Sequence, residues 1–169
     1  MLSIRIATIK DISDIQKIAF STWPVAYSAI ITQEQLNYML DMFYSKESLV
    51  DQIKSNHTFL LAEQDGLSVG FASFNPIKKD VYKLQKLYVL PSMHKSGAGK
   101  LLLNEVISRT RESGAKKLWL NVNRHNKAIG FYEHMGFAII KEDDINIGKN
   151  YYMNDFVMEK DLKITAGIR

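Results

Sequence analysis

The spacing of apolar residues changes along the chain. A helical period predominates in the first third, and alternation predominates after it. Ser3 to Thr8 alternates and predicts a short opening strand. Apolar side chains then recur every three or four positions to about residue 54, which predicts helices. Asp11 stands where the first helix would have its N-cap, Pro24 ends or bends that helix, and Thr32 with Gln35 forms a capping box for the second.

A period of two predominates from residue 58 onward. The predicted strands span 58–63, 68–75, 81–90, 117–122, 137–141 and 151–159. Gln64-Asp65-Gly66 between the first two is typical of a hairpin, and two helices, over 97–113 and 127–135, interrupt the later strands. With no internal repeat or linker, this order predicts a single mixed α/β domain over residues 1–169, with its core at about 3–160.

The composition narrows the classes of protein that need to be considered. Hydrophobic residues make up 46% of the 169 and charged residues 24%, as in ordinary globular proteins. The absence of cysteine excludes disulfides, zinc–thiolate sites and cysteine nucleophiles, and the four histidines have no metal-ligand spacing. The chain begins without a signal-peptide pattern and has no apolar run that would span a bilayer. We therefore expect a cytoplasmic protein with no metal and no membrane partner.

Positive charge is concentrated in one stretch of the chain. Residues 78–117 hold ten Lys/Arg against three acidic residues, a charge of +7, which leaves −3 for the remainder of a chain whose total is +4. Such a region would attract a phosphate-bearing ligand, although lysines on ordinary solvated surfaces give the same pattern. A nucleic-acid-binding module is not expected, because no aromatic-basic platform or helix-turn-helix pattern accompanies the charge.

A glycine-rich turn lies inside this basic stretch, between an apolar strand and a helix. Its sequence is His94-Lys95-Ser96-Gly97-Ala98-Gly99-Lys100. A helix N-terminus suits phosphate, and both glycines permit close approach of the backbone and a positive φ. A Walker A loop and a dinucleotide-binding fingerprint both fail at required positions. A Gln/Arg-x-x-Gly-x-Gly/Ala turn matches at both glycines, with His94 in place of Gln/Arg, but a Gly-x-Gly here could also be purely structural.

A second motif runs from Asn126 to Phe137 and includes Ala128, Phe131-Tyr132 and Gly136. Together with Leu87-Tyr88-Val89 before Pro91 and the glycine turn, it resembles the GNAT superfamily of N-acetyltransferases over essentially the whole chain. The resemblance implies a single-domain α/β fold with a mixed, mostly antiparallel central sheet flanked by helices. Two central parallel strands of that sheet would splay apart and open a cleft for acetyl-CoA.

The resemblance also implies which residues hold the co-substrate. The strand at 87–89 would pair with the pantetheine arm, the turn would hold the pyrophosphate, Asn126 would contact the arm, and Tyr132 would face the thioester sulfur. The implied cofactor-binding residues are Leu87, Tyr88, Val89, His94, Lys95, Ser96, Gly97, Ala98, Gly99, Lys100, Asn126 and Tyr132.

A finer likeness is to the bacterial spermidine/spermine N-acetyltransferase branch, through Trp119-Leu120-Asn121-Val122 and the closing stretch 152–160. It implies a small-molecule primary amine as acceptor, with a polyamine as one candidate. The substrate-binding candidates are Trp23, Tyr27, Tyr38 and Asp155, which offer cation–π contacts and negative charge. Helix-packing aromatics and a solvated acidic surface are the alternative interpretation.

Acetyl transfer needs a neutral amine and a protonated leaving thiolate, and Tyr132 is the candidate general acid because a phenol stays protonated at neutral pH. The base is open: many relatives carry a glutamate where this chain has Lys83 and Gln85, which leaves His94, His125, Glu133, Asp155 or a water chain. Three alternatives also remain: an acetyltransferase for a protein N-terminus of the ribosomal-protein type, one for an antibiotic amine, and a non-catalytic acyl-CoA sensor. The chain could act as a monomer or a homodimer.

Overall fold

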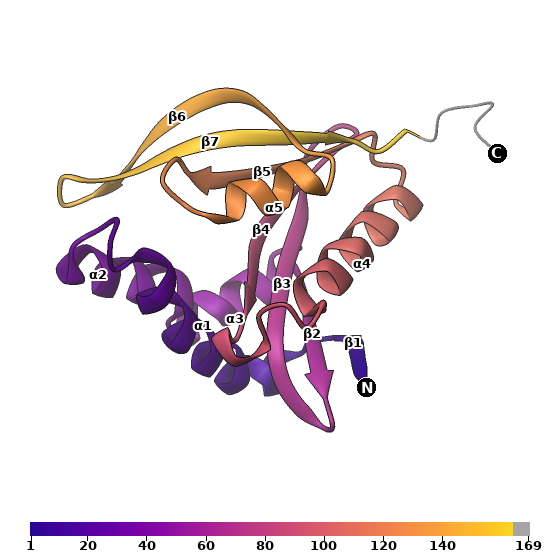
Figure 1. Cartoon of the computed structure of the whole chain (residues 1–169), viewed down its shortest axis with the longest axis horizontal. Coiled ribbons are helices and arrows are strands. Elements are labelled where there is room, and N and C mark those ends of the chain that lie inside the picture. The colour runs from indigo at the N-terminus through magenta and orange to yellow at the C-terminus, as the bar shows by residue number, and fades with distance from the viewer. Residues whose placement is uncertain (164–169) are drawn as a thin grey trace. The chain divides into compact units, whose positions relative to one another are not determined.

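The computed structural model describes residues 1–163, in which helices and strands follow a mixed α/β order (Figure 1). Residues 164–169, which the expected domain included, lie outside the described part. The elements are β1 (Leu2–Ile6), η1 (Ile9–Asp11), α1 (Ile12–Tyr27), α2 (Gln33–Tyr44), α3 (Lys46–Lys54), β2 (Thr58–Gln64), β3 (Leu67–Lys78), β4 (Val81–Val89), η2 (Pro91–Met93), α4 (Ala98–Glu112), β5 (Lys117–Asn123), α5 (Ala128–His134), β6 (Ala138–Gly148) and β7 (Tyr151–Asp161).

Seven strands follow the hydrogen-bonded order β1-β2-β3-β4-β5-β7-β6, so the sheet is mixed and the predicted α/β class is confirmed. The chain folds into two compact units. Unit 1 consists of Met1–Asn75 and Gln85–Val106, and unit 2 of Pro76–Leu84 and the described residues from Ile107 onward. The expectation of one domain over the whole chain stays a prediction.

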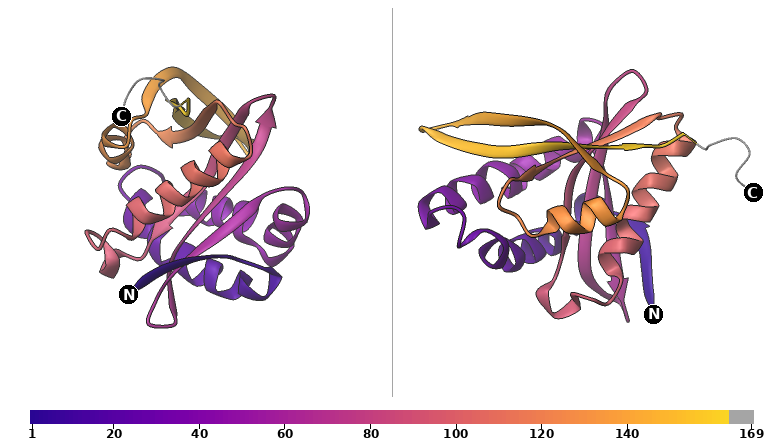
Figure 2. Two further views of the ribbon diagram at one scale, coloured as in Figure 1. Left: turned by 90° about the vertical axis from the view of Figure 1, so that its right-hand side faces the viewer. Right: turned by 45° about the horizontal axis from the view of Figure 1, so that its top comes forward.

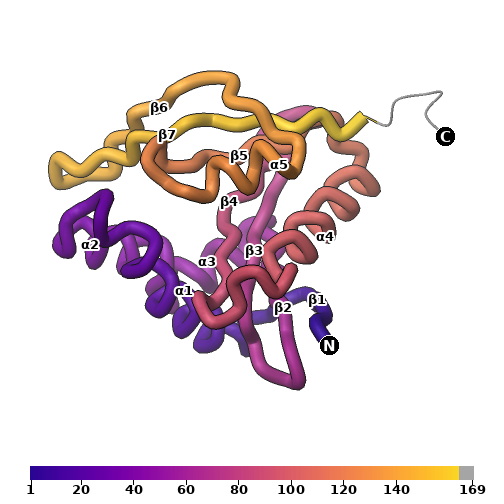
Figure 3. Tube along the Cα trace, in the orientation of Figure 1, coloured from indigo at the N-terminus to yellow at the C-terminus, as the bar shows by residue number. Residues whose placement is uncertain are grey.

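Unit 1 combines an antiparallel meander with three consecutive helices, α1 to α3, which Figure 3 traces ahead of β2. In the meander, β1 pairs with β2 and β2 with β3. The β2–β3 turn is the predicted hairpin: Asp65 and Gly66 have φ of 52° and 81°, the left-handed values that a two-residue loop of this kind requires. The core of this unit includes Ile15, Leu60 and Phe71, each fully buried.

Helix α1 continues through Pro24 to Tyr27, so the proline does not end the helix, and the predicted alternative of a bend stays a prediction. Proline has no N–H to donate, and its ring crowds the carbonyl four residues earlier, here that of Phe20. Phe20 is 49% exposed and Pro24 is also exposed, so water can satisfy the carbonyl that loses its partner. The turn after the proline is regular, since Ser28 N–H donates to Pro24 O at 3.1 Å.

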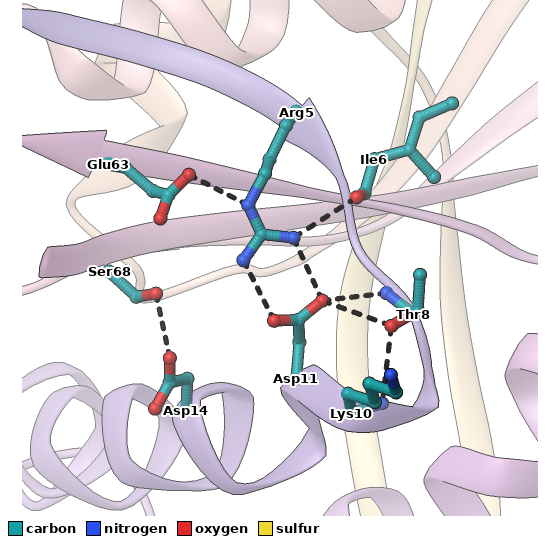
Figure 4. Close-up of polar contacts among 8 residues, drawn as sticks. All are labelled: Arg5, Ile6, Thr8, Lys10, Asp11, Asp14, Glu63 and Ser68. Carbon is teal, nitrogen blue, oxygen red and sulfur yellow. Dashed lines mark hydrogen bonds and ion pairs between the residues drawn. The ribbon is translucent and has the colours of Figure 1, made fainter. Parts of the chain in front are cut away.

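Asp11 is the N-cap residue of α1, as predicted, but its side chain makes no capping hydrogen bond to that helix. Its carboxylate instead accepts from Thr8 N–H at 2.8 Å and completes a capping box for the short helix η1 (Figure 4). The same carboxylate accepts hydrogen bonds from both terminal nitrogens of Arg5, at 2.8 and 3.0 Å. Arg5 Nε donates to the Glu63 carboxylate at 2.8 Å. A charged network therefore ties β1 to η1 and to β2.

Unit 2 contains the first half of β4, the strands β5 to β7 and helix α5. β4 is parallel to β5, which pairs antiparallel with β7, which pairs antiparallel with β6. β6 and β7 form a long twisted hairpin (Figure 2), closed by Lys149 and Asn150 with φ of 51° and 62°. The predicted strand over 137–141 is thus too short, because pairing with β7 carries β6 through the acidic run Glu142-Asp143-Asp144, which has low strand propensity.

Candidate active site

The parallel ladder between β4 and β5 covers only part of either strand. It begins at Val81↔Lys117 and ends at Leu84↔Leu120, although β4 continues to Val89 and β5 to Asn123. Leu87–Val89, the segment expected to pair with a pantetheine arm, lies past the end of this ladder. An extended ligand can add to a strand in β-sheet fashion, which is the role that the sequence predicted for this segment.

The turn after β4 is shaped by its own backbone. Ser96 N–H donates to Met93 O at 3.1 Å, and Lys95 and Gly97 both adopt left-handed backbone, with φ of 67° and 90°. A Cβ at Gly97 would meet no atom within 4 Å, so this position needs glycine for its φ and not for space. Gly99 lies in the first turn of α4 and does not have a positive φ, so of the two glycines only Gly97 uses this conformational freedom.

Helix α4 begins directly at this turn. Ala98 N–H donates to Ser96 Oγ at 3.2 Å, and Leu101 N–H donates to Gly97 O at 2.9 Å. Ala98 is buried beneath the turn, whereas the side chains of His94, Lys95 and Lys100 are exposed. The N-terminus of a fifteen-residue helix with exposed cations is a suitable environment for phosphate.

Tyr132, the candidate acid, lies on α5 in unit 2 and is 8% exposed. Its ring packs edge-on against Phe131 and Phe137, with centroids 5.4 and 5.8 Å away. Gly136 ends the helix with a φ of 94°, and Phe137 N–H returns to Tyr132 O at 3.0 Å. Lys160 Nζ donates to Met135 O at 2.9 Å, which fastens this end of α5 to β7.

Asn126, expected to contact the co-substrate, has a local role in the structure. Its Oδ1 accepts from Ala128 N–H at 2.8 Å, and its carbonyl accepts from Ile129 N–H at 3.3 Å. The side chain therefore fixes the start of α5, the helix that carries Tyr132. Contact with a ligand stays a prediction.

Asp155 is the only Asp, Glu, Lys, Arg or His among the buried residues of the described chain, at 3% exposure. It lies on β7 opposite Asn123, and Asn121 Nδ2 donates to its Oδ2 at 3.3 Å. Burial raises the pKa of Asp155, while the Asn121 hydrogen bond and the positive charge of Lys83 act in the opposite direction. Burial likewise lowers the pKa of Lys83, so each group sits where its charged form is disfavoured.

Unit 1 contains an aromatic cluster around Trp23. Its ring centroid is 4.7 Å from that of Tyr27, 5.6 Å from Tyr44 and 5.8 Å from Tyr88. The hydroxyls of Tyr27 and Tyr88 share a hydrogen bond of 2.8 Å. The structure thus brings two predicted acceptor residues together with a residue of the predicted pantetheine strand, while Tyr38 lies half-buried on α2.

Sequence reasoning missed the environment of Lys86, which enters the same cluster from β4. Its Nζ donates to Gln52 Oε1 at 2.7 Å and lies 5.4 Å from the ring centroid of Tyr44. Burial lowers the pKa of Lys86 to about 8. The sequence pattern could have indicated this environment. Lys86 lies between Leu84 and Tyr88 on one face of the strand, and a lysine on an inward-facing side of a strand is unusual.

Comparison with known proteins identifies the class. Residues 12–137 match the acetyltransferase (GNAT) family, and the chain belongs to that family. It is 28% identical over 165 residues to the spermidine N(1)-acetyltransferase of Thermoplasma acidophilum, covering 94% of this chain and 96% of that protein. It is 37% identical over 84 residues to the [ribosomal protein bS18]-alanine N-acetyltransferase of Haemophilus influenzae, covering 50% of this chain and 53% of that protein.

The crystal structure of PaiA N-acetyltransferase from Thermoplasma acidophilum in complex with coenzyme A superposes with a TM-score of 0.82 at 28% identity, covering 95% of this chain and 99% of that one. The protein is therefore an acyltransferase that uses acetyl-CoA, as the motifs predicted. Within residues 1–163, no group of three or more acidic or histidine side chains is arranged to hold a metal ion. In the same range no helix combines the length and apolar character needed to cross a bilayer.

Proposed function

We propose that the acceptor is a small-molecule primary amine of the polyamine class and that Tyr132 protonates the departing CoA sulfur. The observation that carries the second part is the Tyr132 ring itself, buried on α5 between two phenylalanines in an acetyl-CoA-dependent transferase. The similarity to a spermidine acetyltransferase along nearly the whole chain supports the first part.

In this proposal the co-substrate is held by backbone groups at two places in unit 1. The strand edge at Leu87–Val89 receives the pantetheine arm, and the turn at 94–100 receives the pyrophosphate. The fit is supported by the end of the β4–β5 ladder at Leu84, by the exposed Lys95 and Lys100, and by the start of α4 at Ala98. Asn126, in unit 2, is a further proposed contact of the co-substrate.

Acetyl-CoA supplies a thioester, whose thiolate must be protonated as the amide forms. A phenol, with an ordinary pKa of about 10, stays protonated at neutral pH and can donate this proton. The Phe131 and Phe137 rings leave Tyr132 little freedom to rotate, so its hydroxyl keeps a fixed direction.

The proposed acceptor-binding residues are Trp23, Tyr27 and Tyr38 in unit 1 and Asp155 in unit 2. Aromatic faces attract alkyl ammonium groups, and a buried carboxylate attracts them more strongly still. The Trp23–Tyr27 contact and the burial of Asp155 support these roles.

Replacing Tyr132 with phenylalanine tests the acid. Because the ring packing is kept, Tyr132→Phe should still bind acetyl-CoA in calorimetry, while kcat for thiol release falls on the order of 100-fold. Tyr152→Phe, at a tyrosine 47% exposed on β7, is the matched control and should leave kcat unchanged. Full kcat in Tyr132→Phe would remove the acid role.

A panel of amines tests the acceptor class. Spermidine, free lysine and a peptide with an N-terminal alanine are compared by kcat/KM at saturating acetyl-CoA, with thiol release as the readout. The peptide represents the second candidate, which the 37% identity to the ribosomal-protein enzyme favours over half of the chain. A preference for the peptide over spermidine would defeat the polyamine proposal and leave the acetyltransferase intact.

A further inference from the structure

The second half of β4, Gln85–Val89, lies past the end of the parallel ladder with β5, so contacts other than this ladder must fix its position. We propose that Tyr27 is a positioning residue for the co-substrate, because its hydroxyl holds Tyr88 and thereby the segment Leu87–Val89. This inference rests on the proposed function, in which that segment receives the pantetheine arm. All the residues that carry it belong to unit 1.

The first argument is that side chains of this half of β4 are bonded to three neighbouring elements, β3, α3 and α1. The bonds join Gln85 Nε2 to Asn75 Oδ1 at 2.9 Å, Lys86 Nζ to Gln52 Oε1 at 2.7 Å, and the hydroxyls of Tyr88 and Tyr27 at 2.8 Å. Because side chains alternate along a strand, Lys86 and Tyr88 share one side of β4. Two helices therefore hold that side of the strand.

The second argument is that Tyr27 is itself held firmly. It is the last residue of α1, and its carbonyl accepts hydrogen bonds from Ile30 and Ile31 N–H at 2.9 and 3.0 Å. Its ring centroid lies 4.7 Å from that of Trp23, which is 4% exposed and also lies 5.8 Å from the Tyr88 ring. The hydroxyl bond thus joins two rings that the same buried tryptophan contacts.

The third argument is energetic. A ligand that adds to a strand needs backbone N–H and C=O groups in fixed directions, and ordering a loose strand costs part of the binding free energy. If the Tyr27–Tyr88 bond is lost, the second half of β4 spends less time in the binding arrangement, and the apparent affinity falls by the same factor. The chemical step would not change, because the bond acts on the backbone that holds the co-substrate.

The experiment is calorimetry of acetyl-CoA binding, without amine, to wild type, Tyr27→Phe and Thr22→Val. Tyr27→Phe keeps the ring and removes the hydroxyl, so we expect Kd to rise about fivefold, the effect of one hydrogen bond. At saturating acetyl-CoA and spermidine, kcat should stay within about twofold of wild type. The absence of amine separates this role from contact with the acceptor.

Thr22→Val is the matched control, because it removes another buried hydroxyl from the same helix. Thr22 is 5% exposed, and its Oγ1 donates to Ala19 O at 3.2 Å, within α1. This variant should lower the unfolding free energy but leave Kd for acetyl-CoA unchanged. A rise in Kd equal to that of Tyr27→Phe would show a general effect of destabilising α1 and would overturn the inference, as would a Kd of Tyr27→Phe within twofold of wild type.

A double-mutant cycle tests whether the two hydroxyls act through one bond. Tyr88→Phe should raise Kd by a similar factor, and the double variant should bind no more weakly than the weaker single variant. A double variant whose loss is the product of the two single losses would contradict the proposal. If Tyr27→Phe does not fold, Tyr88→Phe decides by the same twofold limit.

Hydrogen exchange separates failure of this inference from failure of the proposed function. Acetyl-CoA should slow amide exchange at Leu87–Val89 in wild type, and without ligand these amides should exchange faster in Tyr27→Phe. If acetyl-CoA gives no protection there in wild type, the proposed co-substrate site is wrong and the inference falls with it. If protection is present but Tyr27→Phe exchanges and binds as wild type does, only the positioning role is refuted.

Discussion

Replacing Lys86 with methionine should stabilise the fold at neutral pH, because burial disfavours the charged form of the half-buried Lys86 side chain. Its one hydrogen bond goes to Gln52 Oε1 at 2.7 Å, and its other neighbours are the rings of Phe43, Tyr44 and Phe59, with centroids 5.4–5.9 Å from Nζ. Methionine has a similar length and no charge, so it can fill the same space.

The magnitude follows from the lowered pKa of Lys86, about 8 in the folded protein. An unfolded lysine titrates near 10.4, and a difference of about 2.4 units corresponds to roughly 3 kcal/mol. Because the folded value is the lower one, the folded state is least stable below pH 8 and gains stability as the pH rises from 8 toward 10.4. Loss of the Gln52 hydrogen bond and the ring contacts costs the variant about 1–2 kcal/mol. We therefore expect Lys86→Met to be about 1–2 kcal/mol more stable at pH 7.

Urea unfolding of wild type and Lys86→Met between pH 7 and 9.5 measures this difference directly. Two groups near Lys86 are shifted away from this window, because burial lowers the pKa of His57 and raises that of Tyr44. The advantage of the variant should shrink as the pH passes 8, whereas Lys79→Met, at an exposed lysine, should show no such trend. A constant difference across the window would refute the reasoning.

Two further predictions concern backbone and charge. Arg5→Met should lower the unfolding free energy by about 1 kcal/mol at pH 7. Because Arg5 holds the pKa of Asp11 below 3.8, this penalty is present above that pH and should vanish as the pH falls through the folded-state value, which urea titrations from pH 3 to 7 would show. Gly97→Ala should cost about 1 kcal/mol by forcing alanine to a φ of 90°, and should weaken CoA binding in calorimetry. Gly130→Ala, inside α5 with no atom within 4 Å of the new Cβ, should instead stabilise by about 0.5–1 kcal/mol, and equal effects at both glycines would contradict the argument.

Local chemistry made much of the fold predictable from sequence. The hairpin at Asp65-Gly66, the cap of Thr32 on Gln35 N–H and the stop of α4 at Gly114 each depend on a few adjacent residues, and each is present. The prediction for the length of β6 failed because a distant part of the chain decides it. Pairing with β7 extends the strand.

Part of the candidate site could likewise be predicted from the sequence, and part could not. The glycine turn and Tyr132 lie in contiguous motifs, so the sequence alone pointed to them. Asp155 could be named from its charge. Its burial and its hydrogen bond to Asn121, which lies 34 positions earlier on another strand, have no local signature in the sequence. The environment of Lys86 likewise depends on Gln52, 34 positions earlier in the chain.

The two tryptophans happen to fall one in each compact unit, Trp23 in unit 1 and Trp119 in unit 2. Trp23 is 4% exposed among aromatic rings, whereas the Trp119 indole donates to Glu159 at 2.7 Å and has Lys78 Nζ 4.3 Å above its ring. Their emission should differ, since one fluorophore is shielded and the other has a cation against its face. Single-tryptophan variants would therefore give each half of the molecule its own optical reporter, and whether the halves melt together becomes a question that a fluorimeter can answer.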